Sequence, residues 1–257
     1  MLNQLFDLSG RVALVTGGSK GIGKAIARGY AEAGANVAIS ARNEDQLQAA
    51  AEEIGQGLDV QVDYRVCDML QRDQVNDLAR WAIDTLGRVD VLVNNAGGNQ
   101  PQSLVETTDE VWDRILELNL TSCMQLSRAV APQMIERKWG RIIYTSSVMA
   151  LASNAARGLY SATKAALVGM ARAQALELGP HGITVNCIAP GPVATDLPMS
   201  LLSDEQKKKF SDRTAVLRWG QTIDMVGPAL LLGTDAGAYV TGTVILADGG
   251  MLCRTFD

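Results

Sequence analysis

The chain has 257 residues, 47% hydrophobic and 20% charged, with a formal net charge of −5 at pH 7, as expected of a globular protein with one sizeable core. Its basic residues are scattered among acidic ones, which excludes nucleic acid and anionic membranes as expected partners. No apolar run approaches the roughly 18 residues of a membrane span, and the first ten residues hold no Lys or Arg, so we expect a cytoplasmic protein.

Short apolar runs rich in β-branched residues alternate with longer amphipathic stretches along the whole chain. This alternation is typical of β-α-β units, which build a parallel sheet. Seven strands are predicted, at 12–16, 36–40, 60–66, 89–97, 141–147, 183–191 and 243–250. Helices are predicted to about Ala33, through Ala49 to Ile54, through Trp81, from about Asp109 to Glu136 and from about Gly158 to Leu178. We therefore expect a single-domain Rossmann fold, with a doubly wound parallel sheet and helices on both faces.

The stretch from Pro192 to about Trp219 departs from this alternation. Its sequence LPMSLLSDEQKKKF predicts a short amphipathic helical insertion that follows a strand. Ligands of open α/β sheets bind beyond the carboxyl ends of the strands. The insertion is therefore predicted to act as a lid.

A glycine-rich segment, TGGSKGIG at 16–23, lies between the first predicted strand and the first predicted helix. Glycines let the backbone turn tightly and approach a pyrophosphate, which then meets the unpaired N–H groups at the start of the helix. A purely structural turn is the alternative. The strand before and the helix after the glycines favour a dinucleotide site.

The end of the second strand bears on the choice between NAD and NADP. NAD-selective sites of this fold usually place an acid there to accept hydrogen bonds from the ribose 2′-OH. Here Ala41 holds that place, Arg42 follows it, and Lys20 in the glycine loop is a second cation. Because a guanidinium can bind a 2′-phosphate through two hydrogen bonds, we predict NADP(H). The alternative is that both are surface cations and that NAD(H) is also accepted.

Tyr160 and Lys164 lie four residues apart early in a predicted helix, which places them on one face. A cation close to a tyrosine hydroxyl favours the phenolate, so the pair suits proton transfer to and from a substrate. Such pairs are also common on solvated helices. The catalytic interpretation therefore depends on the neighbouring motifs.

Several ordered motifs resemble those of the short-chain dehydrogenase/reductase family over essentially the whole chain. They are TGGSKGIG, NNAG at 94–97, Asn119 within ELNLTS, Ser147 after RIIYTS, YSATK, and PGPVAT. The resemblance implies an NAD(P)-dependent oxidoreductase that interconverts a ketone and a secondary alcohol by hydride transfer. It implies that Tyr160 is the acid/base and that Ser147 hydrogen-bonds the substrate oxygen. It further implies that Lys164 binds the nicotinamide ribose and that Asn119 supports a water between the lysine and solvent.

The same resemblance implies a cofactor site, with Asp68 at the adenine and with Asn95, Val193 and Thr195 at the ribose or carboxamide end. No metal is expected. The predicted cofactor-binding residues are Gly17, Ser19, Lys20, Gly21, Ile22, Gly23, Arg42, Asp68, Met69, Asn95, Ala96, Gly97, Tyr160, Lys164, Pro190, Gly191, Val193 and Thr195.

Ser146 and Ser147 are adjacent at a strand end, and their side chains point to opposite faces if the strand persists. Only one of them can then reach the substrate. The family resemblance, through its spacing of thirteen residues before Tyr160, selects Ser147.

Three segments are predicted to face the substrate: 98–100, 149–157 and 192–210. Their polar candidates, for hydroxyls or a carboxylate, are Asn99, Gln100 and Arg157, and their apolar candidates are Met149, Leu197 and Met199. For Arg157, a surface cation at a helix start is the alternative.

Both ends of the chain resemble polyol and sugar-acid members of the family such as gluconate 5-dehydrogenases, which suggests gluconate and 5-ketogluconate as substrates. The main rival is a 3-oxoacyl-(acyl-carrier-protein) reductase, which needs basic residues at the pocket mouth for an acidic carrier. Lys207, Lys208 and Lys209 are candidates, although a charge run is more often a solvated face. A catalytically silent NADP-binding regulator is an alternative of another class.

Ala165, Gly169 and Ala173 recur at every fourth position of the helix that carries Tyr160. Small residues at that spacing permit close helix contact and suggest a subunit interface, and the family resemblance implies a homotetramer. A crowded contact within the chain is the alternative.

The cysteines and the single histidine narrow the kinds of site further. His181 is the only histidine, which excludes histidine-based triads and His-rich metal sites. The cysteines lack CxxC spacing, so we expect reduced, mostly buried thiols and neither disulfides nor a zinc site. They are Cys67, Cys123, Cys187 and Cys253.

Overall fold

The computed structural model describes residues 1–253, except for the side chains of Leu197 and Pro198. Within these residues, seven strands form one sheet in the order β3-β2-β1-β4-β5-β6-β7, and every neighbouring pair is parallel. The strands are β1 (Val12–Thr16), β2 (Asn36–Ala41), β3 (Val62–Val66), β4 (Val91–Asn94), β5 (Gly140–Thr145), β6 (Ile183–Pro190) and β7 (Val244–Ala247). This confirms the predicted Rossmann-type fold.

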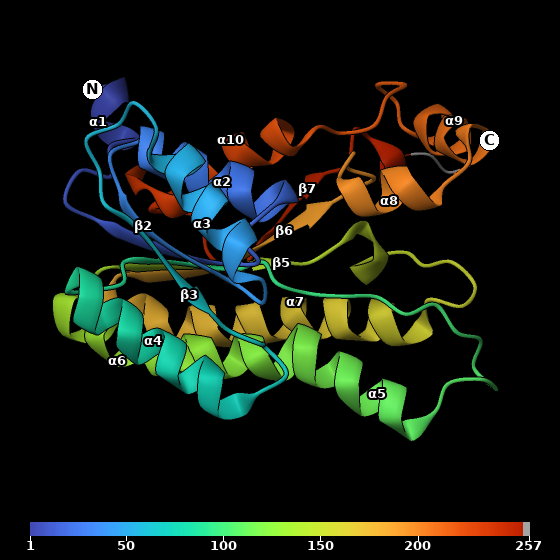
Figure 1. Ribbon diagram of the computed structural model, residues 1–257, viewed down its shortest axis with the longest axis horizontal. Helices are drawn as coiled ribbons and strands as arrows, with labels where there is room; N and C mark the ends of the chain where they lie inside the picture. The colour runs from blue at the N-terminus through green and yellow to red at the C-terminus, as the bar shows by residue number, and fades with distance from the viewer. Residues whose placement is uncertain (254–257) are drawn as a thin grey trace.

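Helices cover both faces of the sheet (Figure 1). On one face lie α2 (Gly21–Glu32), α3 (Glu44–Gly55) and α10 (Val226–Gly233). On the other lie α4 (Arg72–Leu86), α5 (Asp109–Leu116), α6 (Ser122–Arg137) and α7 (Gly158–Leu178). A short helix, α1 (Leu2–Leu5), precedes β1.

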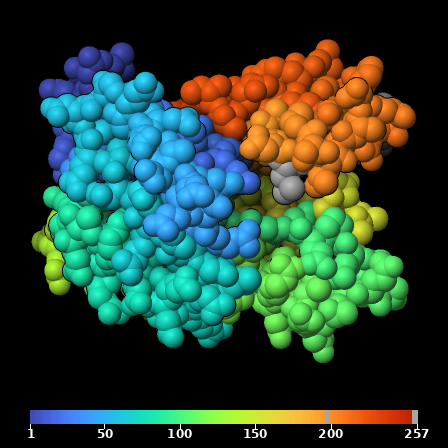
Figure 2. All heavy atoms as spheres, viewed as in Figure 1, coloured from blue at the N-terminus to red at the C-terminus, as the bar shows by residue number. Residues whose placement is uncertain are grey.

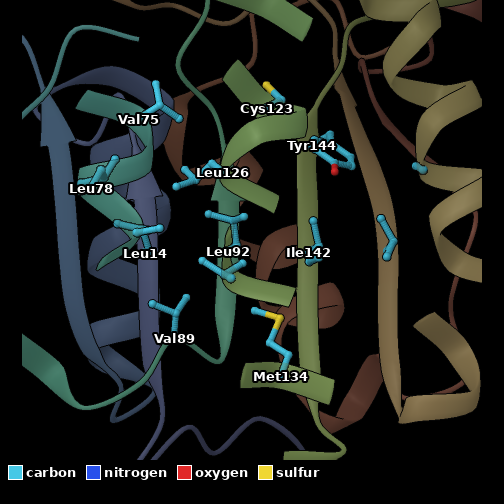
Figure 3. Packing of buried hydrophobic residues seen from close by; sticks show 14 of the residues in the cluster. Leu14, Val75, Leu78, Val89, Leu92, Cys123, Leu126, Met134, Ile142 and Tyr144 are labelled. Atoms are coloured by element: carbon cyan, nitrogen blue, oxygen red, sulfur yellow. The ribbon is translucent and has the colours of Figure 1, made fainter. Parts of the chain in front are cut away.

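The central strands are buried on both faces because helices cover each side. Every residue of β1, β4, β5 and β6 is buried, whereas the edge strands β3 and β7 are partly exposed. Successive side chains of a strand point to opposite faces, so Leu14 of β1 joins one core cluster and Ala13 and Val15 join the other. Figure 3 shows Leu14, Leu92 and Ile142 in a row across β1, β4 and β5.

The predicted single helix from Asp109 to Glu136 is interrupted, which corrects that prediction. A π-helical turn, η1 (Glu117–Thr121), separates α5 from α6. Such turns shift the register of a helix and are frequent at functional sites. Here the turn contains Asn119, whose buried side chain is bonded to residues outside the helix.

The segment 192–219 contains two helices rather than one short insertion: α8 (Asp196–Leu201) and α9 (Asp204–Arg213). Ser203 begins α9 with a capping box, in which Ser203 and Gln206 bond each other's main chain. The Trp219 indole donates a 2.8 Å hydrogen bond to the Lys207 carbonyl and meets the Phe210 ring edge-on at 5.2 Å. The segment follows β6 directly and lies across a hollow from α5 (Figures 1 and 2).

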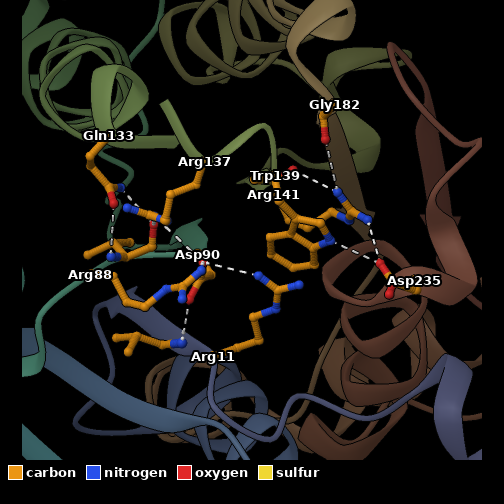
Figure 4. Close-up of polar contacts among 12 residues, drawn as sticks. Arg11, Arg88, Asp90, Gln133, Arg137, Trp139, Arg141, Gly182 and Asp235 are labelled. Carbon is orange, nitrogen blue, oxygen red and sulfur yellow. Dashed lines mark hydrogen bonds and ion pairs between the residues drawn. The ribbon is translucent and has the colours of Figure 1, made fainter. Parts of the chain in front are cut away.

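At the opposite, amino-terminal end of the strands, a buried carboxylate collects three guanidinium groups (Figure 4). Asp90 is fully buried, with Arg88 at 2.6 Å and Arg11 and Arg137 each at 3.6 Å. Asp90 also accepts a 3.0 Å hydrogen bond from the Val12 N–H, which joins the starts of β1 and β4. This cluster stabilises the end of the sheet away from the predicted site. Among the described residues, no helix is long and apolar enough to cross a membrane.

Candidate active site

The glycine loop connects the end of β1 to the start of α2, as predicted. Gly17 and Gly21 have φ angles of 65° and 60°, which favour glycine. A Cβ on Gly23 would lie 2.3 Å from the Gly17 carbonyl oxygen, so the first turn of α2 can pack this closely only with glycine there. Lys20 is exposed at the N-cap of α2 and makes no side-chain cap bond, and Ser19 and Ile22 flank it half-buried.

The loop after β4 is bonded to the glycine loop. The Thr16 hydroxyl accepts hydrogen bonds from the N–H groups of Asn95 and Ala96, each at 3.0 Å. The Asn95 amide donates in turn to the Thr16 carbonyl at 3.0 Å. β1 and β4 are the strands between which the chain order reverses, the place where ligands bind in such sheets.

Three further segments reach the same edge of the sheet. Arg42 is exposed directly after β2, and β2 ends in Ala41 with no acid. Asp68 is half-buried after β3 and accepts a 3.1 Å hydrogen bond from the Leu70 N–H, while Met69 is buried. The predicted adenine-side residues thus lie at the ends of β2 and β3.

The turn after β6 borders the glycine loop on the side away from β2 and β3. The Gly191 N–H bonds the Ala247 carbonyl at 3.1 Å, which fixes the position of Pro190 and Gly191 beside β7. A Cβ on Gly21 would lie 3.2 Å from the Thr195 methyl group, so this turn contacts the glycine loop directly. Val193 is buried beneath it.

These residues fit a dinucleotide, because the closely packed glycines leave the start of α2 open to a pyrophosphate. The segments after β2 and β3 would hold the adenine end of the dinucleotide, and the segments after β4 and β6 would hold the nicotinamide end. Gly97 lies at the far end: a Cβ there would be 3.1 Å from the Asn119 side-chain oxygen and 3.4 Å from the Lys164 ammonium. The predicted cofactor and catalytic residues therefore meet at Gly97.

Tyr160 and Lys164 lie on one face of α7. The Lys164 Nζ atom is 5.6 Å from the centre of the Tyr160 ring and donates a 2.7 Å hydrogen bond to the Thr145 carbonyl at the end of β5. Lys164 is only 5% exposed and, within residues 1–253, has no carboxylate partner. A buried cation therefore lies beside the tyrosine.

Asn119 connects the π-helical turn to this pair. Its side chain both donates to and accepts from the main chain of Gly98, each bond being 2.9 Å, and it donates to the Thr163 hydroxyl at 3.1 Å. Asn119 thereby joins Thr163 of α7, the residue before Lys164, to the loop that follows β4. A straight α-helix through 109–136 would place this side chain differently.

The structure separates the two adjacent serines. β5 ends at Thr145, so both serines follow the strand. The Ser146 hydroxyl donates to the Lys164 carbonyl at 2.9 Å and is buried, whereas Ser147 lines the same cavity as Tyr160. Ser147 accepts a 3.1 Å hydrogen bond from the Met149 N–H, which leaves its own proton available to a substrate.

The cavity has a volume of about 810 Å³. Of the residues predicted to face the substrate, Asn99, Met149 and Arg157 line this cavity, whereas Met199 lies on α8 outside its lining. The predicted Gln100 instead accepts a hydrogen bond from Arg114 of α5, and the Leu197 side chain is outside the described residues. Phe210 of α9, the last residue of the predicted segment 192–210, also lines the cavity. Sequence reasoning missed further lining residues, which are Val148, Arg213 of α9, Leu246, Met251 and Leu252.

Two buried thiols lie near Lys164. Burial raises the pKa of Cys123 to about 11 and that of Cys187 to about 12, and the positive charge of Lys164 opposes both shifts. The thiols therefore stay protonated at neutral pH. We assign them no part in proton transfer.

The chain matches the family model for short chain dehydrogenases over residues 11–206. It is 34% identical to the 3-oxoacyl-(acyl-carrier-protein) reductase of Aquifex aeolicus over 244 residues, which are 95% of this chain and 98% of that relative. The chain therefore belongs to the short-chain dehydrogenase family and is an NAD(P)-dependent oxidoreductase.

Two solved structures illustrate the range of similar proteins. A gluconate 5-dehydrogenase from Burkholderia cenocepacia, in complex with NADP and tartrate, matches with a TM-score of 0.93 and 32% identity over 99% of this chain and 100% of that one. A 7α-hydroxysteroid dehydrogenase, in complex with NADH and 7-oxo glycochenodeoxycholic acid, matches with a TM-score of 0.92 and 37% identity over 96% of each chain. Similar folds thus carry different substrates and both cofactors.

Proposed function

We propose that the protein interconverts a ketone and a secondary alcohol, with Tyr160 as the acid/base and with NADP(H) as the preferred cofactor. The observation that carries this proposal is that Tyr160 and Ser147 line one cavity while the buried ammonium of Lys164 lies behind the tyrosine. The Tyr160 hydroxyl can lose and regain a proton, and the Ser147 hydroxyl can hydrogen-bond the substrate oxygen in the same cavity.

Each side chain has a separate task in this mechanism. Ser147 donates a hydrogen bond to the substrate oxygen, keeps its own proton, and so orients the carbonyl. Tyr160 gives a proton to that oxygen during reduction and takes it back during oxidation, and the positive charge of Lys164 favours the phenolate that remains. Asn119 fixes Thr163 and the main chain of Gly98 in place around Tyr160 and Lys164. The nicotinamide, when bound, supplies or accepts the hydride.

The preference for NADP(H) rests on charge at the end of β2. Arg42 and Lys20 are both exposed, neither forms an ion pair within residues 1–253, and the last residue of β2 is Ala41 rather than an acid. Two free cations at this edge favour a 2′-phosphate, which a guanidinium binds through paired hydrogen bonds.

The substrate we propose is a polyol or sugar acid, such as gluconate and its 5-keto form. Asn99, Asn154 and Ser153 offer hydrogen bonds to hydroxyl groups around the cavity, and Arg157 and Arg213 offer positive charge. The similarity to a gluconate 5-dehydrogenase that binds tartrate supports this choice. We also propose that α8 and α9 act as a lid over the bound substrate.

A 3-oxoacyl-(acyl-carrier-protein) reductase is the second candidate, supported by the 34% identity to the Aquifex aeolicus enzyme. Such an activity needs free cations to receive an acidic carrier. Lys207 and Lys208 of α9 face carboxylates on their own helix, Asp204 at 3.5 Å and Asp212 at 2.7 Å. Internal pairing reduces the charge that this helix offers to a carrier.

Parallel assays separate the two candidates. The kcat/KM with NADPH is measured for 5-keto-D-gluconate and for acetoacetyl-pantetheine, a short β-ketoacyl thioester. We expect the sugar acid to be reduced at least about tenfold more efficiently, a difference of about 1.4 kcal/mol in transition-state binding. The opposite order would favour the carrier-protein reductase.

We further propose a homotetramer in which α7 packs against another subunit. Ala165, Gly169 and Ala173 are exposed, and a Cβ on Gly169 would meet no other atom within 4 Å. The small residues are therefore not explained by crowding within the chain. Sedimentation at micromolar concentration tests this proposal, and a monomer would contradict it.

A further inference from the structure

The cavity beside Tyr160 has a one-sided charge. Among the described residues that line it are two arginines, Arg157 and Arg213, and no Asp, Glu or Lys. A cavity lined by cations without anions attracts negative ligands. The substrate side of the site is therefore positive.

Neither guanidinium has an acidic partner in the part of the chain that the structure describes. Within residues 1–253, the side chains of Arg157 and Arg213 form no ion pair. Five residues beyond Arg213, by contrast, Arg218 binds both oxygens of Asp224, at 2.6 Å and 3.1 Å. The donors of the first two arginines are thus available to a ligand.

Arg157 occupies a position that a structural role would not favour. It is the N-cap residue of α7, a 21-residue helix, and its side chain forms no cap bond. A cation at a helix N-terminus meets the positive end of the helix dipole, which costs free energy. The residue before it, Ala156, adopts a left-handed conformation with φ of 60°, which is also unfavourable for a residue with a Cβ. A bound anion would offset the positive charge of the Arg157 guanidinium and the positive end of the α7 dipole.

Arg213 comes from the other wall, at the last turn of α9. The chain that follows it is fixed, because Thr214 is buried and the Ala215 N–H bonds the Gly249 carbonyl at 2.8 Å. Arg213 also lies three residues after Phe210, so both side chains share the face of α9 that lines the cavity. The main chain that carries Arg213 is therefore fixed beside the cavity, although the side chain is exposed.

We propose that Arg157 and Arg213 together bind a carboxylate of the substrate and so determine specificity for oxo acids over neutral ketones. This deepens the proposed function and rests on it. Arg157 lies about one helical turn before Tyr160, so a short hydroxylated chain can join the bound carboxylate to the reacting carbonyl. Because one arginine belongs to α7 and the other to α9, an anion shared between them joins the proposed lid to the body of the protein.

The first test measures binding without turnover. Calorimetry compares tartrate, a dicarboxylate, with threitol, its neutral analogue, on the full chain saturated with NADP+. We expect tartrate to bind at least about tenfold more tightly, and Arg157→Gln and Arg213→Gln each to weaken tartrate about 10- to 100-fold, as expected for a charged hydrogen bond. Threitol binding should not change, and Arg213→Lys should retain part of the affinity.

The matched control is Lys209→Gln, which removes an exposed cation from the same helix outside the cavity lining. It should leave tartrate binding unchanged, and NADP+ binding should be unchanged in every variant. If tartrate binds both arginine variants as tightly as the native protein, or if Lys209→Gln weakens it equally, the proposal is wrong.

A second test separates this proposal from the proposed function. Reduction of 5-keto-D-gluconate is compared with that of L-sorbose, which carries CH2OH in place of the carboxylate. In the native protein the acid should be preferred, and in the arginine variants the ratio of the two kcat/KM values should fall at least about tenfold. If neither ketone is reduced but tartrate binding still depends on both arginines, the proposed reaction fails while the anion site stands.

Discussion

The Lys164 ammonium donates a 2.7 Å hydrogen bond to the main-chain carbonyl of Thr145, and this bond connects α7 to the end of β5 next to Ser146 and Ser147. The ammonium is buried without a carboxylate partner among residues 1–253. A buried charge without an opposite charge destabilises a folded protein. Lys164 is therefore better explained by its position beside Tyr160 than by a contribution to folding.

Replacement of Lys164 by Met should lower activity without lowering stability. The change removes the cation that favours the Tyr160 phenolate, so we expect kcat/KM for ketone reduction to fall about 100-fold or more. It also removes a buried charge, so the temperature of unfolding should stay the same or rise. Lys209→Met, at an exposed position, should change neither quantity. A Lys164→Met variant that unfolds much earlier and retains turnover would reverse this interpretation.

Replacement of Tyr160 by Phe should abolish proton transfer and little else. Loss of a general acid/base typically costs 10²- to 10⁴-fold in rate, and we expect kcat to fall by about that factor. NADPH binding, followed by fluorescence titration, should persist, because Tyr160→Phe removes one hydroxyl and leaves the glycine loop and the other predicted cofactor-binding residues unaltered. Tyr239→Phe is the control, since Tyr239 is fully exposed. This combination would exclude a catalytically silent regulator, whereas unchanged turnover would contradict the assignment of Tyr160.

The fold was predictable because its strands are short apolar runs that helices bury on both faces. The predicted helix from Gly158 to Leu178 agrees with α7 at both ends. The interruption at Glu117–Thr121 was not predictable, because no Pro or Gly within 109–131 marks a break in the helix. The π-helical turn depends on the bonds of Asn119 to Gly98, a contact between residues distant in the sequence.

The site was predictable where short motifs fix geometry, as in the four-residue spacing of Tyr160 and Lys164. Choosing between Ser146 and Ser147 needed the family resemblance, because the direction of each side chain depends on where β5 ends. Arg213 could have been found from its spacing to Phe210 on an amphipathic helix. The contribution of Met251 and Leu252 could not have been found, because nothing in the sequence around them indicates that these two residues line the cavity.

Replacement of Asp90 by Asn should destabilise the fold and leave the site intact. Three guanidinium groups surround this buried carboxylate, and an uncharged amide would leave them without their anion. Removing one partner from a buried ion pair costs about 3–5 kcal/mol, and we expect a loss in this range by urea unfolding. Asp77→Asn, which breaks an exposed pair with Arg80 at 3.2 Å, should cost about 0–1 kcal/mol. If Asp90→Asn and Asp77→Asn lower the free energy of unfolding equally, the cluster around Asp90 does not stabilise the fold.

Replacement of Arg42 by Asp should reverse the proposed cofactor preference. The carboxylate repels a 2′-phosphate and can accept hydrogen bonds from a ribose 2′-OH, so kcat/KM should fall with NADPH and rise with NADH. A change of about tenfold or more in the ratio of the two values is expected from a charged hydrogen bond. Arg128→Asp, at an exposed position on α6, is the control. A preference that survives in Arg42→Asp would remove Arg42 from cofactor recognition and leave Lys20 as the remaining candidate.

The four thiols should differ in their reactivity toward alkylation, because the thiolate is the reacting form. Burial raises the pKa of Cys67 and of Cys123 to about 11 and that of Cys187 to about 12, so all three are protonated at pH 8 and shielded as well. Cys253 is exposed. Iodoacetamide at pH 8 should therefore add one group to the native protein by mass spectrometry, none to Cys253→Ser, and four to the native sequence in denaturant. The three buried thiols become more reactive only as the pH rises toward their pKa values. Adducts on Cys123 or Cys187 of the native protein at pH 8 would therefore mean that the core around Lys164 opens in solution.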